Sequence, residues 1–262
     1  YITKQGQWRR GPELVKPVEN MAGLTWDRAE AKDSAANVQI IFQQSGEELA
    51  DGEKIDVVFP LLHGTFGEDG TIQGLLEIAS VPYVGAGVLA SAVGMDKVMM
   101  KKIFAHEGLP QCVYRSFTRR QWEEEQSFYL LEVEVSIGYP CFVKPANLGS
   151  SVGISKAYNR EQLLKAVELA FQYDRKVIVE EFIDGREIEV GVLGNDNPQV
   201  SVPGEIVSSN EFYDYNAKYI DGKSKMLIPA DIPPRAAEEI QQLAIRAFTA
   251  IEASGLSRVD FF

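Results

Sequence analysis

The stretch from residue 139 to residue 154 constrains the fold of this chain most, because it places a lysine and a glycine-rich loop between two apolar runs. Residues 141–143 predict a buried strand that ends at Lys144, and the loop that follows contains Gly149 and Gly153. Glycine lets a backbone turn sharply and approach a ligand closely, and the N–H groups of such a turn bind anions. We therefore expect a strand–loop–strand hairpin that holds phosphate. The alternative is an ordinary hairpin with a surface lysine.

This loop differs from two common phosphate-binding motifs. A Walker loop has its lysine after the glycines and runs from a strand into a helix, whereas Lys144 precedes the glycines and a strand is expected to follow them. A dinucleotide-binding fingerprint needs a third glycine and a helix, which the pattern from Gly149 to Gly153 lacks. The sequence thus points to a different kind of phosphate site.

The acidic balance of the chain excludes one class of partner. Its 262 residues carry a formal net charge of −12 at pH 7, whereas a nucleic-acid surface needs a basic face. We expect no nucleic-acid partner, and an anionic ligand would have to be held by locally placed lysines and backbone N–H groups. The apolar content of 45% is that of an ordinary globular protein with a substantial core.

The cysteine count and the lengths of the apolar runs predict the compartment. Cys112 and Cys141 are too few for a disulfide framework in a chain of this length. No run approaches the ~18 residues of a membrane-spanning helix, and no signal segment opens the chain. We expect a cytoplasmic protein without a membrane partner. Both ends look cut, since Tyr1 is not a methionine and Phe262 lies within an apolar strand pattern, so we expect a fragment.

The first part of the chain alternates strand and helix patterns. Residues 54–62 form an apolar run typical of a buried strand, and a glycine-rich loop follows at 63–70. Helical spacing of apolar residues predicts a helix over 71–80, and a short strand and turn are expected at 82–87. This order is typical of α/β folds, in which ligands bind at the carboxyl ends of strands.

The rest of the chain mixes both kinds of element. One helix is predicted over 96–106, a second begins at the capping box of Asn159 and Gln162, and a third begins at Pro233. Strands are predicted at 112–117, 141–144, 176–183, 187–193 and 258–262. The turn at Asp184 and Gly185 is expected to join two of these strands directly. Residues 205–228 show little periodicity, and an irregular stretch of that length is usually functional or mobile.

Several charged residues lie where they could contact a ligand. Lys97 follows Asp96 at a predicted helix start, where a solvated lysine is the simple explanation and a second phosphate contact beside Lys144 is the alternative. Glu180 and Glu181 are adjacent in a strand and so point to opposite faces. We expect one of them to accept a hydrogen bond and the other to face solvent.

The last two predicted strands also carry charges on one face. Glu187 and Glu189 share a face, where solvated carboxylates are usual, although Glu187 lies close to the turn. Arg258 and Asp260 share a face as well. They could form a structural ion pair, or a phosphate contact beside a Mg²⁺ ligand. His63 directly follows a strand, where ligand contacts cluster.

A tyrosine-rich segment reads Phe-Tyr-Asp-Tyr-Asn-Ala-Lys-Tyr at residues 212–219 and contains Lys218. Such a loop could close over a ligand and exclude water. The alternative is a disordered surface loop, for which four aromatic residues in eight are a poor composition.

Taken in order, these motifs resemble the D-alanine–D-alanine ligase family of the ATP-grasp superfamily, and the resemblance runs from about Ile2 to the end of the chain. They are Leu62-His-Gly-Thr-Phe-Gly-Glu-Asp-Gly70, Gly94-Met-Asp-Lys97, Val143-Lys-Pro145, Gly149-Ser-Ser-Val-Gly153, Val179-Glu-Glu181, the 212–219 loop and Arg258-Val-Asp260. The first motif and the tyrosine-rich loop are specific within the superfamily. The resemblance implies an α/β (α+β) protein with an ATP-grasp fold preceded by a Rossmann-like N-terminal domain. On this chain the three domains would be residues 1–94, a central lid domain at 95–182 and a C-terminal domain at 183–262.

The resemblance also implies roles for individual residues. For ATP it implies Lys97, Lys144, Gly149 and Ser151 at the phosphates, Glu180 at the adenine amino group, the backbone of Glu181 and Ile183 at adenine, Glu187 at the ribose and Lys218 at the γ-phosphate. For catalysis it implies Ser150 and Tyr219, hydrogen-bonded across the first amino-acid site, Arg258 at the developing charge and His63 near the substrate. Asp260 would bind Mg²⁺, with Mn²⁺ as an alternative.

The implied reaction joins two D-alanines for peptidoglycan. ATP would phosphorylate the carboxylate of the first, the amine of the second would attack the acyl phosphate, and phosphate would leave. The protein would supply positioning and charge stabilisation, and its closed loop would exclude water. The resemblance also implies a homodimer, which is the usual oligomeric state in the family.

Two features of the family pattern are absent from this sequence, namely an N-terminal glycine-rich loop with its glutamate and the segment after Phe262 with the remaining Mg²⁺ ligands. One alternative is therefore a truncated nucleotide-binding fragment without turnover. Another is a D-alanine–D-lactate ligase, although Tyr219 within Asp-Tyr-x-Ala-Lys-Tyr favours an amine nucleophile.

Overall fold

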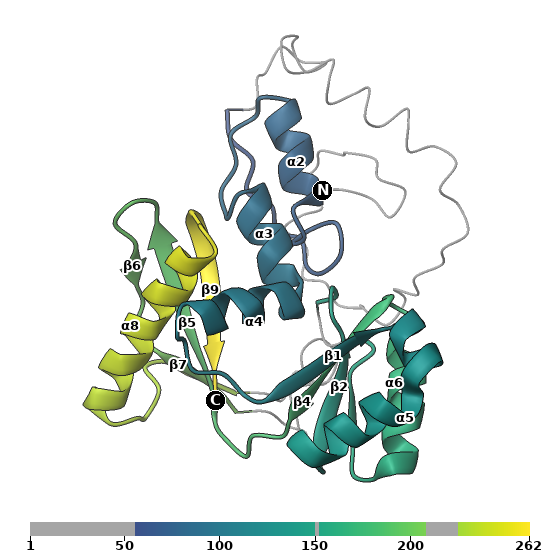
Figure 1. Ribbon diagram of the computed structural model, residues 1–262. Coiled ribbons are helices and arrows are strands. Elements are labelled where there is room, and N and C mark those ends of the chain that lie inside the picture. Colours follow the sequence, from purple (N-terminus) through teal and green to yellow (C-terminus); the bar gives the residue numbers. More distant parts are fainter. Residues whose placement is uncertain (1–55, 150–151, 208–224) are drawn as a thin grey trace. The chain divides into compact units, whose positions relative to one another are not determined.

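Figure 1 shows the computed structural model, which describes residues 56–149, 152–207 and 225–262. The chain divides into two compact units, the smaller formed by residues 1–58 and 75–83 and the larger by residues 59–74 and 84–262. Within the described ranges, no helix is long and apolar enough to cross a membrane. The larger unit contains two β-sheets, and these carry most of the candidate site.

The prediction of a strand at 54–62 is wrong for residues 56–62, which the structure describes. Val58 makes one isolated parallel bridge with Tyr83, and the neighbouring Val57 is exposed. Parallel strands are stable where both faces of their sheet are covered, and in the described part of the chain this segment has Tyr83 as its only strand partner. The helix predicted at 71–80 is present as α2 (Thr71–Ile78).

Two more short helices lie between α2 and the first sheet in the chain, and the sequence predicted one of these two. The unpredicted helix α3 (Val88–Met95) is apolar through most of its length, so it lacks the polar face that marks a helical period. The predicted helix is confirmed as α4 (Lys97–His106). Asp96 caps it, because its Oδ1 accepts the N–H groups of Val98 and Met99, each at 3.1 Å.

The first sheet contains four antiparallel strands in the order β1-β4-β2-β3. The strands are β1 (Tyr114–Thr118), β2 (Cys141–Pro145), β3 (Ser155–Ala157) and β4 (Lys176–Glu181). Helices α5 (Arg119–Ser136) and α6 (Arg160–Ala170) cover one of its faces (Figure 1). The predictions of strands near 112–117, 141–144 and 176–183 are therefore confirmed, with ends that differ by a few residues.

Helix α5 was not predicted, although a capping box between Thr118 and Gln121 marks its start. Helix α6 was predicted from Asn159, whose Oδ1 accepts the N–H of Gln162 at 3.0 Å. The side chain of Gln162 returns to the N–H of Tyr158 at 2.8 Å, one residue earlier than a capping box requires. The cap at Asn159 is thus confirmed, but the reciprocal hydrogen bond of Gln162 goes to the N–H of Tyr158 rather than to that of Asn159.

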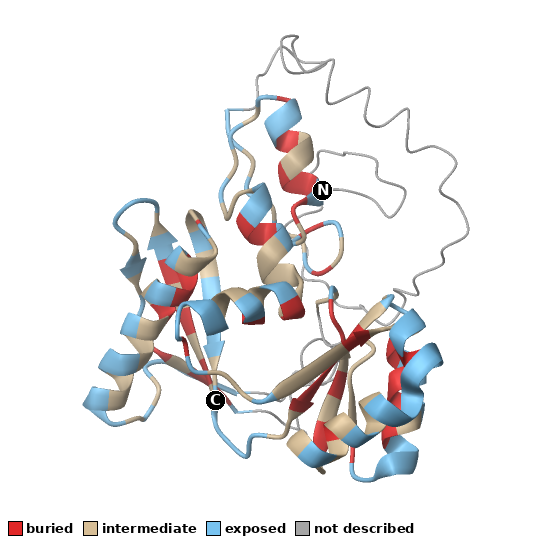
Figure 2. Ribbon diagram, viewed as in Figure 1, coloured by how far each residue is buried: buried red, intermediate tan, exposed pale blue. Residues whose placement is uncertain are grey.

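Buried positions recur along the strands of this sheet (Figure 2), because successive side chains alternate between its two faces, and one set packs with α5 and α6 in a common core. Cys141 and Val143 of β2 and Val179 of β4 are buried there. Phe117 stacks on Trp122 in the same core, with ring centroids 4.8 Å apart. The residues between them along β2 and β4 consequently point to the opposite face of the sheet, which carries the candidate site.

The second sheet is also antiparallel. Its strands are β5 (Glu187–Gly194), β6 (Gln199–Val200), β7 (Gly204–Val207), β8 (Lys225–Leu227) and β9 (Gly255–Phe261). β9 pairs with β5 from Ile188 to Gly194, and β6 and β7 pair with β5 as well. Helix α8 (Pro234–Ala250), which confirms the predicted C-terminal helix, packs Phe248 against Val190 and Val192.

Two predictions about connections are wrong. β4 and β5 do not form a hairpin through Asp184 and Gly185, because β4 pairs with β1 and β2 whereas β5 belongs to the other sheet. The segment 205–228 is not irregular at its ends, since β7 and β8 pair with each other there. In both cases the partners are distant in sequence, so local periodicity could not reveal them. Residues 208–224 lie outside the described part of the chain.

Candidate functional site

A buried carboxylate surrounded by lysines forms the centre of the candidate site. Glu180 of β4 lies opposite Phe142 of β2 and Tyr114 of β1 in the sheet register. Lys144 lies two residues further along β2 and therefore on the same face. Helix α4 adds Lys97 and Lys101, so one helix and two strands bring four charged groups together.

Both oxygens of Glu180 are engaged by lysines. Its Oε2 lies 2.5 Å from Nζ of Lys144, and its Oε1 lies 2.9 Å from Nζ of Lys101. Burial by itself raises the pKa of Glu180, but the positive charges of Lys144 and Lys101 outweigh it and hold the pKa at about 2. Glu180 is consequently ionised throughout the physiological range, and it is a hydrogen-bond acceptor as the sequence analysis expected of one of the two glutamates.

The side chain of Lys97, on α4, reaches the beginning of the glycine-rich loop. Its Nζ donates to the carbonyl oxygen of Leu148 at 2.6 Å and to that of Pro145 at 3.2 Å. Burial and the positive charge of Lys144 lower the pKa of Lys97 to about 8. The simple explanation of a solvated lysine is therefore wrong: α4 directs this side chain into the loop that follows β2.

Sequence reasoning missed Lys101. It lies one helical turn after Lys97, and side chains four residues apart lie on the same side of a helix. That spacing was the available signal. Its ammonium group is buried and contacts Glu180, the Sγ of Cys112 at 3.2 Å and, at 5.3 Å from the centroid, the ring of Tyr114. Lys101 is the most enclosed lysine of the cluster.

The cluster carries a surplus of positive charge. Its three lysines face one carboxylate within the cluster, since Lys101 and Lys144 contact Glu180 and Lys97 lies nearby, while Asp96 and Asp174 act on Lys97 from outside it. The mutual repulsion of Lys97 and Lys144 is visible in the lowered pKa of Lys97. An anion placed beside them would relieve that repulsion, and a phosphate group is the ligand that lysines and loop N–H groups bind together.

The glycine-rich loop approaches the loop that contains His63. A Cβ built on Gly149 would lie 3.2 Å from the Cα of Gly64, a close approach that favours glycine at this position. His63 itself is exposed, and its Nδ1 lies 3.8 Å from Glu68. The two motifs are thus neighbours in space. The remaining loop candidates, which are Ser150, Ser151, Lys218 and Tyr219, lie outside the described residues.

Glu181 and Ile183, which follow Glu180 in the chain, have different surroundings from it. Glu181 is half-buried rather than solvent-facing, and its carboxylate accepts the N–H of Val113 at 2.6 Å. The expectation that one of the two glutamates simply faces solvent is therefore wrong, because the segment before β1 reaches over Glu181. Ile183 follows the end of β4 and is exposed.

The second sheet presents its own group of charged residues. In the register of β5 with β9, Glu189 lies opposite Asp260 and Gly191 lies opposite Arg258. Arg258 lies 2.8 Å from Asp260 and 3.2 Å from Glu189. Burial would lower the pKa of Arg258, but the hydrogen bonds and charges of these carboxylates outweigh it and raise that pKa. Glu187, at the start of β5, shares this face, so the predicted faces of both strands are confirmed.

The described residues do not make a metal site by themselves. Among residues 56–149, 152–207 and 225–262, no three or more His, Cys, Asp or Glu side chains are grouped so as to hold a metal ion. Asp260 offers one carboxylate, which is engaged with Arg258. Mg²⁺ needs about six oxygen ligands in octahedral geometry, so among the described residues Asp260 could supply one of these ligands.

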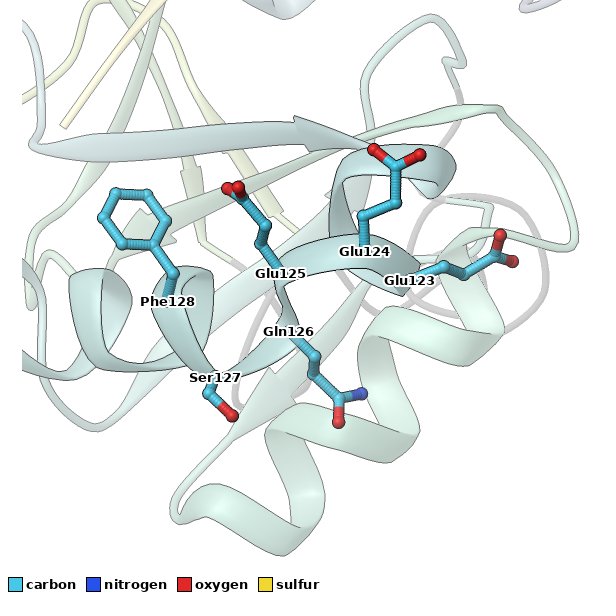
Figure 3. Close-up of a pocket in the computed structure, with 6 residues that line it drawn as sticks. All are labelled: Glu123, Glu124, Glu125, Gln126, Ser127 and Phe128. Carbon is cyan, nitrogen blue, oxygen red and sulfur yellow. The ribbon is translucent and has the colours of Figure 1, made fainter.

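A surface pocket elsewhere in the molecule does not belong to this site. It lies on α5 at Glu125, whose backbone is non-helical, and its volume is about 670 Å³. It is lined by Glu123, Glu124, Glu125, Gln126, Ser127 and Phe128. Figure 3 shows that these side chains spread away from one another rather than converge. Its three carboxylates would repel an anionic ligand.

Comparisons with known proteins find relatives that match this chain along its whole length. Residues 1–86 match the family described as D-ala D-ala ligase N-terminus, and residues 103–262 match the one described as D-ala D-ala ligase C-terminus. The chain is 57% identical over 264 residues to a D-alanine–D-alanine ligase of Bacillus velezensis, covering 100% of this chain and 74% of that protein. It is 54% identical to the enzyme of the same name from Geobacillus kaustophilus, covering 100% and 71%.

Solved structures agree with this result. The VanG D-Ala:D-Ser ligase from Enterococcus faecalis superimposes with a TM-score of 0.71 and 42% identity, covering 80% of this chain and 60% of that one. The D-alanine–D-alanine ligase from Coxiella burnetii gives 0.67 and 39%, covering 80% and 55%. The chain therefore spans between half and two thirds of these solved chains. Matches to both family parts and relatives more than half identical along its whole length show that the chain belongs to the D-alanine–D-alanine ligase family, with a mixed α/β fold, an N-terminal domain and an ATP-grasp C-terminal domain.

Proposed function

We propose that this chain binds ATP at the lysine cluster around Glu180 and joins two D-alanines into D-alanyl-D-alanine for peptidoglycan. The observation that carries the proposal is that Lys101 and Lys144 hold one buried carboxylate, while Lys97 reaches into the adjoining glycine-rich loop. The surplus positive charge favours a polyanion, and family membership supports ATP as that polyanion.

Each side chain of the cluster has a proposed role. Lys97 and Lys144, with the N–H groups of the Gly149 loop, contact the phosphates. Glu180 accepts a hydrogen bond from the adenine amino group, and the backbone of Glu181 and Ile183 completes the recognition of adenine. An ionised carboxylate suits this role, because it offers acceptors and no donor, and the low pKa of Glu180 keeps it in that form.

The second sheet has proposed roles in the same reaction. Glu187 contacts the ribose, Arg258 stabilises negative charge that develops on the reacting groups, and Asp260 is one ligand of Mg²⁺ or Mn²⁺. The ion would neutralise phosphate charge when bound. Arg258 already lies against two carboxylates, so part of its positive charge is balanced in the free protein.

The further candidates belong to the proposal on the strength of the resemblance. Ser150 and Tyr219 link across the first amino-acid site, Lys218 and the Ser151 N–H reach the phosphates, and His63 lies near the substrate. The proximity of Gly64 to Gly149 supports the last of these, because it brings the His63 loop to the phosphate-binding loop. The chemistry is the phosphorylation of a D-alanine carboxylate, followed by attack of the amine of the second D-alanine on the acyl phosphate.

The organisation of the protein completes the proposal. The domains are residues 1–94, 95–182 and 183–262, with a Rossmann-like first domain. The enzyme is a cytoplasmic homodimer. The separation of the two sheets, with β4 in one and β5 in the other, supports a boundary near residue 183.

Replacement of Lys144 tests the nucleotide site. Lys144→Ala should weaken ATP binding by about 10- to 100-fold, because a hydrogen bond to a charged group contributes about 1.5–3 kcal/mol. Isothermal titration calorimetry with ATP on the full-length enzyme measures this change. Lys165→Ala is the matched control, since that lysine is exposed on α6 and pairs with Glu161 at the surface. Unchanged ATP affinity in a folded Lys144→Ala protein would reject the site.

A further inference from the structure

The two lysines that hold Glu180 differ in their surroundings. The side chain of Lys101 is 9% exposed, whereas that of Lys144 is 21% exposed. Lys101 is held from several elements, because its Nζ contacts Glu180 on β4 and Cys112 before β1 and lies over the ring of Tyr114 on β1. Its backbone carbonyl also accepts the side-chain amide of Gln111 at 2.8 Å. Lys101 is therefore built into the protein, and Lys144 is the more accessible partner.

This difference has a consequence for nucleotide binding, given the proposed function. If Lys144 contacts the nucleotide, its hydrogen bond to Glu180 weakens when the ligand binds. A buried carboxylate without a counterion is strongly disfavoured and tends to take up a proton. A second, permanent cation on the other oxygen prevents this. Lys101 occupies that position at 2.9 Å from Oε1.

We propose that Lys101 is a positioning residue, which keeps Glu180 ionised and correctly oriented for the adenine amino group while Lys144 contacts the nucleotide. Lys101 is not itself a ligand of ATP. It acts through Glu180, and its loss should alter the recognition of the base rather than the binding of phosphate.

The choice of base distinguishes this role from a general effect of charge. Adenine presents an amino group to Glu180, whereas hypoxanthine in inosine triphosphate presents a carbonyl oxygen at the same position. An ionised carboxylate accepts from the amino group and repels the carbonyl oxygen. A protonated carboxyl group can donate to that oxygen. Selectivity for ATP over inosine triphosphate therefore reports the state of Glu180.

The groups facing Glu180 determine the expected pH dependence. They are Lys101 on α4, Lys144 on β2 and Cys112 before β1, with Lys97 contributing to the local charge. In the wild-type protein the pKa of Glu180 is about 2, so selectivity should not change between pH 5.5 and 7.5. Removal of Lys101 leaves burial opposed by fewer positive charges, those of Lys144 and Lys97, which raises the pKa of Glu180. Selectivity should then fall as the pH is lowered.

Titration calorimetry of the full-length enzyme with ATP, inosine triphosphate and tripolyphosphate tests the proposal. We expect wild-type enzyme to prefer ATP by about tenfold or more. Lys101→Met should lose most of that preference, increasingly so at pH 5.5, and bind tripolyphosphate within about threefold of wild type. Lys101→Arg should restore the preference. Lys102→Met is the matched control, since Lys102 is the neighbouring exposed lysine on α4, and it should behave as wild type.

Several results would overturn the positioning role. Equal losses for all three ligands would mean that Lys101 acts as a phosphate-binding charge. Retained selectivity in Lys101→Met, with a lowered melting temperature, would mean that its role is structural. If Lys101→Met does not fold, Lys101→Gln keeps an N–H donor without the charge, and full ATP selectivity in that variant at pH 5.5 would also reject the role. Absence of ATP binding to the wild-type enzyme would instead reject the proposed function itself.

Discussion

Replacement of Glu180 by glutamine tests the electrostatics of the lysine cluster. The shift of its pKa from 4.5 to about 2 corresponds to about 3 kcal/mol of stability at pH 7, since one pKa unit is worth about 1.4 kcal/mol. Glutamine has nearly the same shape but no charge. It leaves the buried Lys101 and the half-buried Lys144 without this counterion, and the loss of one partner of a buried pair costs about 3–5 kcal/mol. We expect Glu180→Gln to lower the free energy of unfolding by about 3 kcal/mol.

The effect should depend on pH in a defined direction. The pKa of Glu180 is lower in the folded than in the unfolded protein, so its stabilising effect is present above pH 4.5 and is lost as the pH falls toward 2. The difference in unfolding free energy between wild type and Glu180→Gln should therefore decrease from about 3 kcal/mol at pH 7 to roughly half of that at pH 3.

Urea denaturation followed by circular dichroism at several pH values between 3 and 7 measures both quantities. Glu161→Gln is a suitable control, because Glu161 pairs with Lys165 on the exposed surface of α6, where such pairs contribute little. Its unfolding free energy should match that of wild type at every pH. A Glu180→Gln variant as stable as wild type at pH 7, or a loss that is equal at pH 3 and pH 7, would refute the reasoning.

Two further predictions concern the loop and the product. Gly153→Ala should lower the free energy of unfolding by about 1–3 kcal/mol, because Gly153 has a φ of 71° and a Cβ there would lie 2.7 Å from Tyr173 and 2.9 Å from Pro145. Gly185→Ala is the control in the same thermal denaturation assay, because its Cβ would come no closer than 3.4 Å to its neighbours. Equal stabilities of the two variants would contradict the predicted strain at Gly153. In a competition between D-alanine and D-lactate near neutral pH, the full-length enzyme should make mainly the dipeptide, and chromatography that found mainly the ester would favour the D-alanine–D-lactate alternative.

Local features of the sequence were sufficient for several predictions that depend on a local interaction. The pleat of a strand alternates side chains between two faces, so Arg258 and Asp260 could be placed together on one face, as could Glu187 and Glu189. Capping depends on residues within one turn, so the helix starts at Asp96 and Asn159 were predictable. Motif order along the chain was also sufficient to indicate the family.

Non-local pairing explains the errors. The run at 54–62 has strand composition, but a strand needs partners, and composition does not supply them. The chain from Lys176 to Leu193 looked like a hairpin because two strand patterns flank a turn, yet each strand pairs with other strands far away in sequence. The missed helix α5 is the exception, because the capping box of Thr118 and Gln121 marks its start locally.

The charge cluster shows most clearly what tertiary structure decided. The sequence determined that Lys97, Lys144 and Glu180 are charged residues near a glycine-rich loop, and it predicted that Glu180 and Glu181 face opposite sides of a strand. Only the packing of α4 against the face of the first sheet opposite α5 and α6 brought Lys101 to the second oxygen of Glu180. The strength of a charge interaction depends on distance and burial, and these are set by elements that lie about eighty residues apart in the chain.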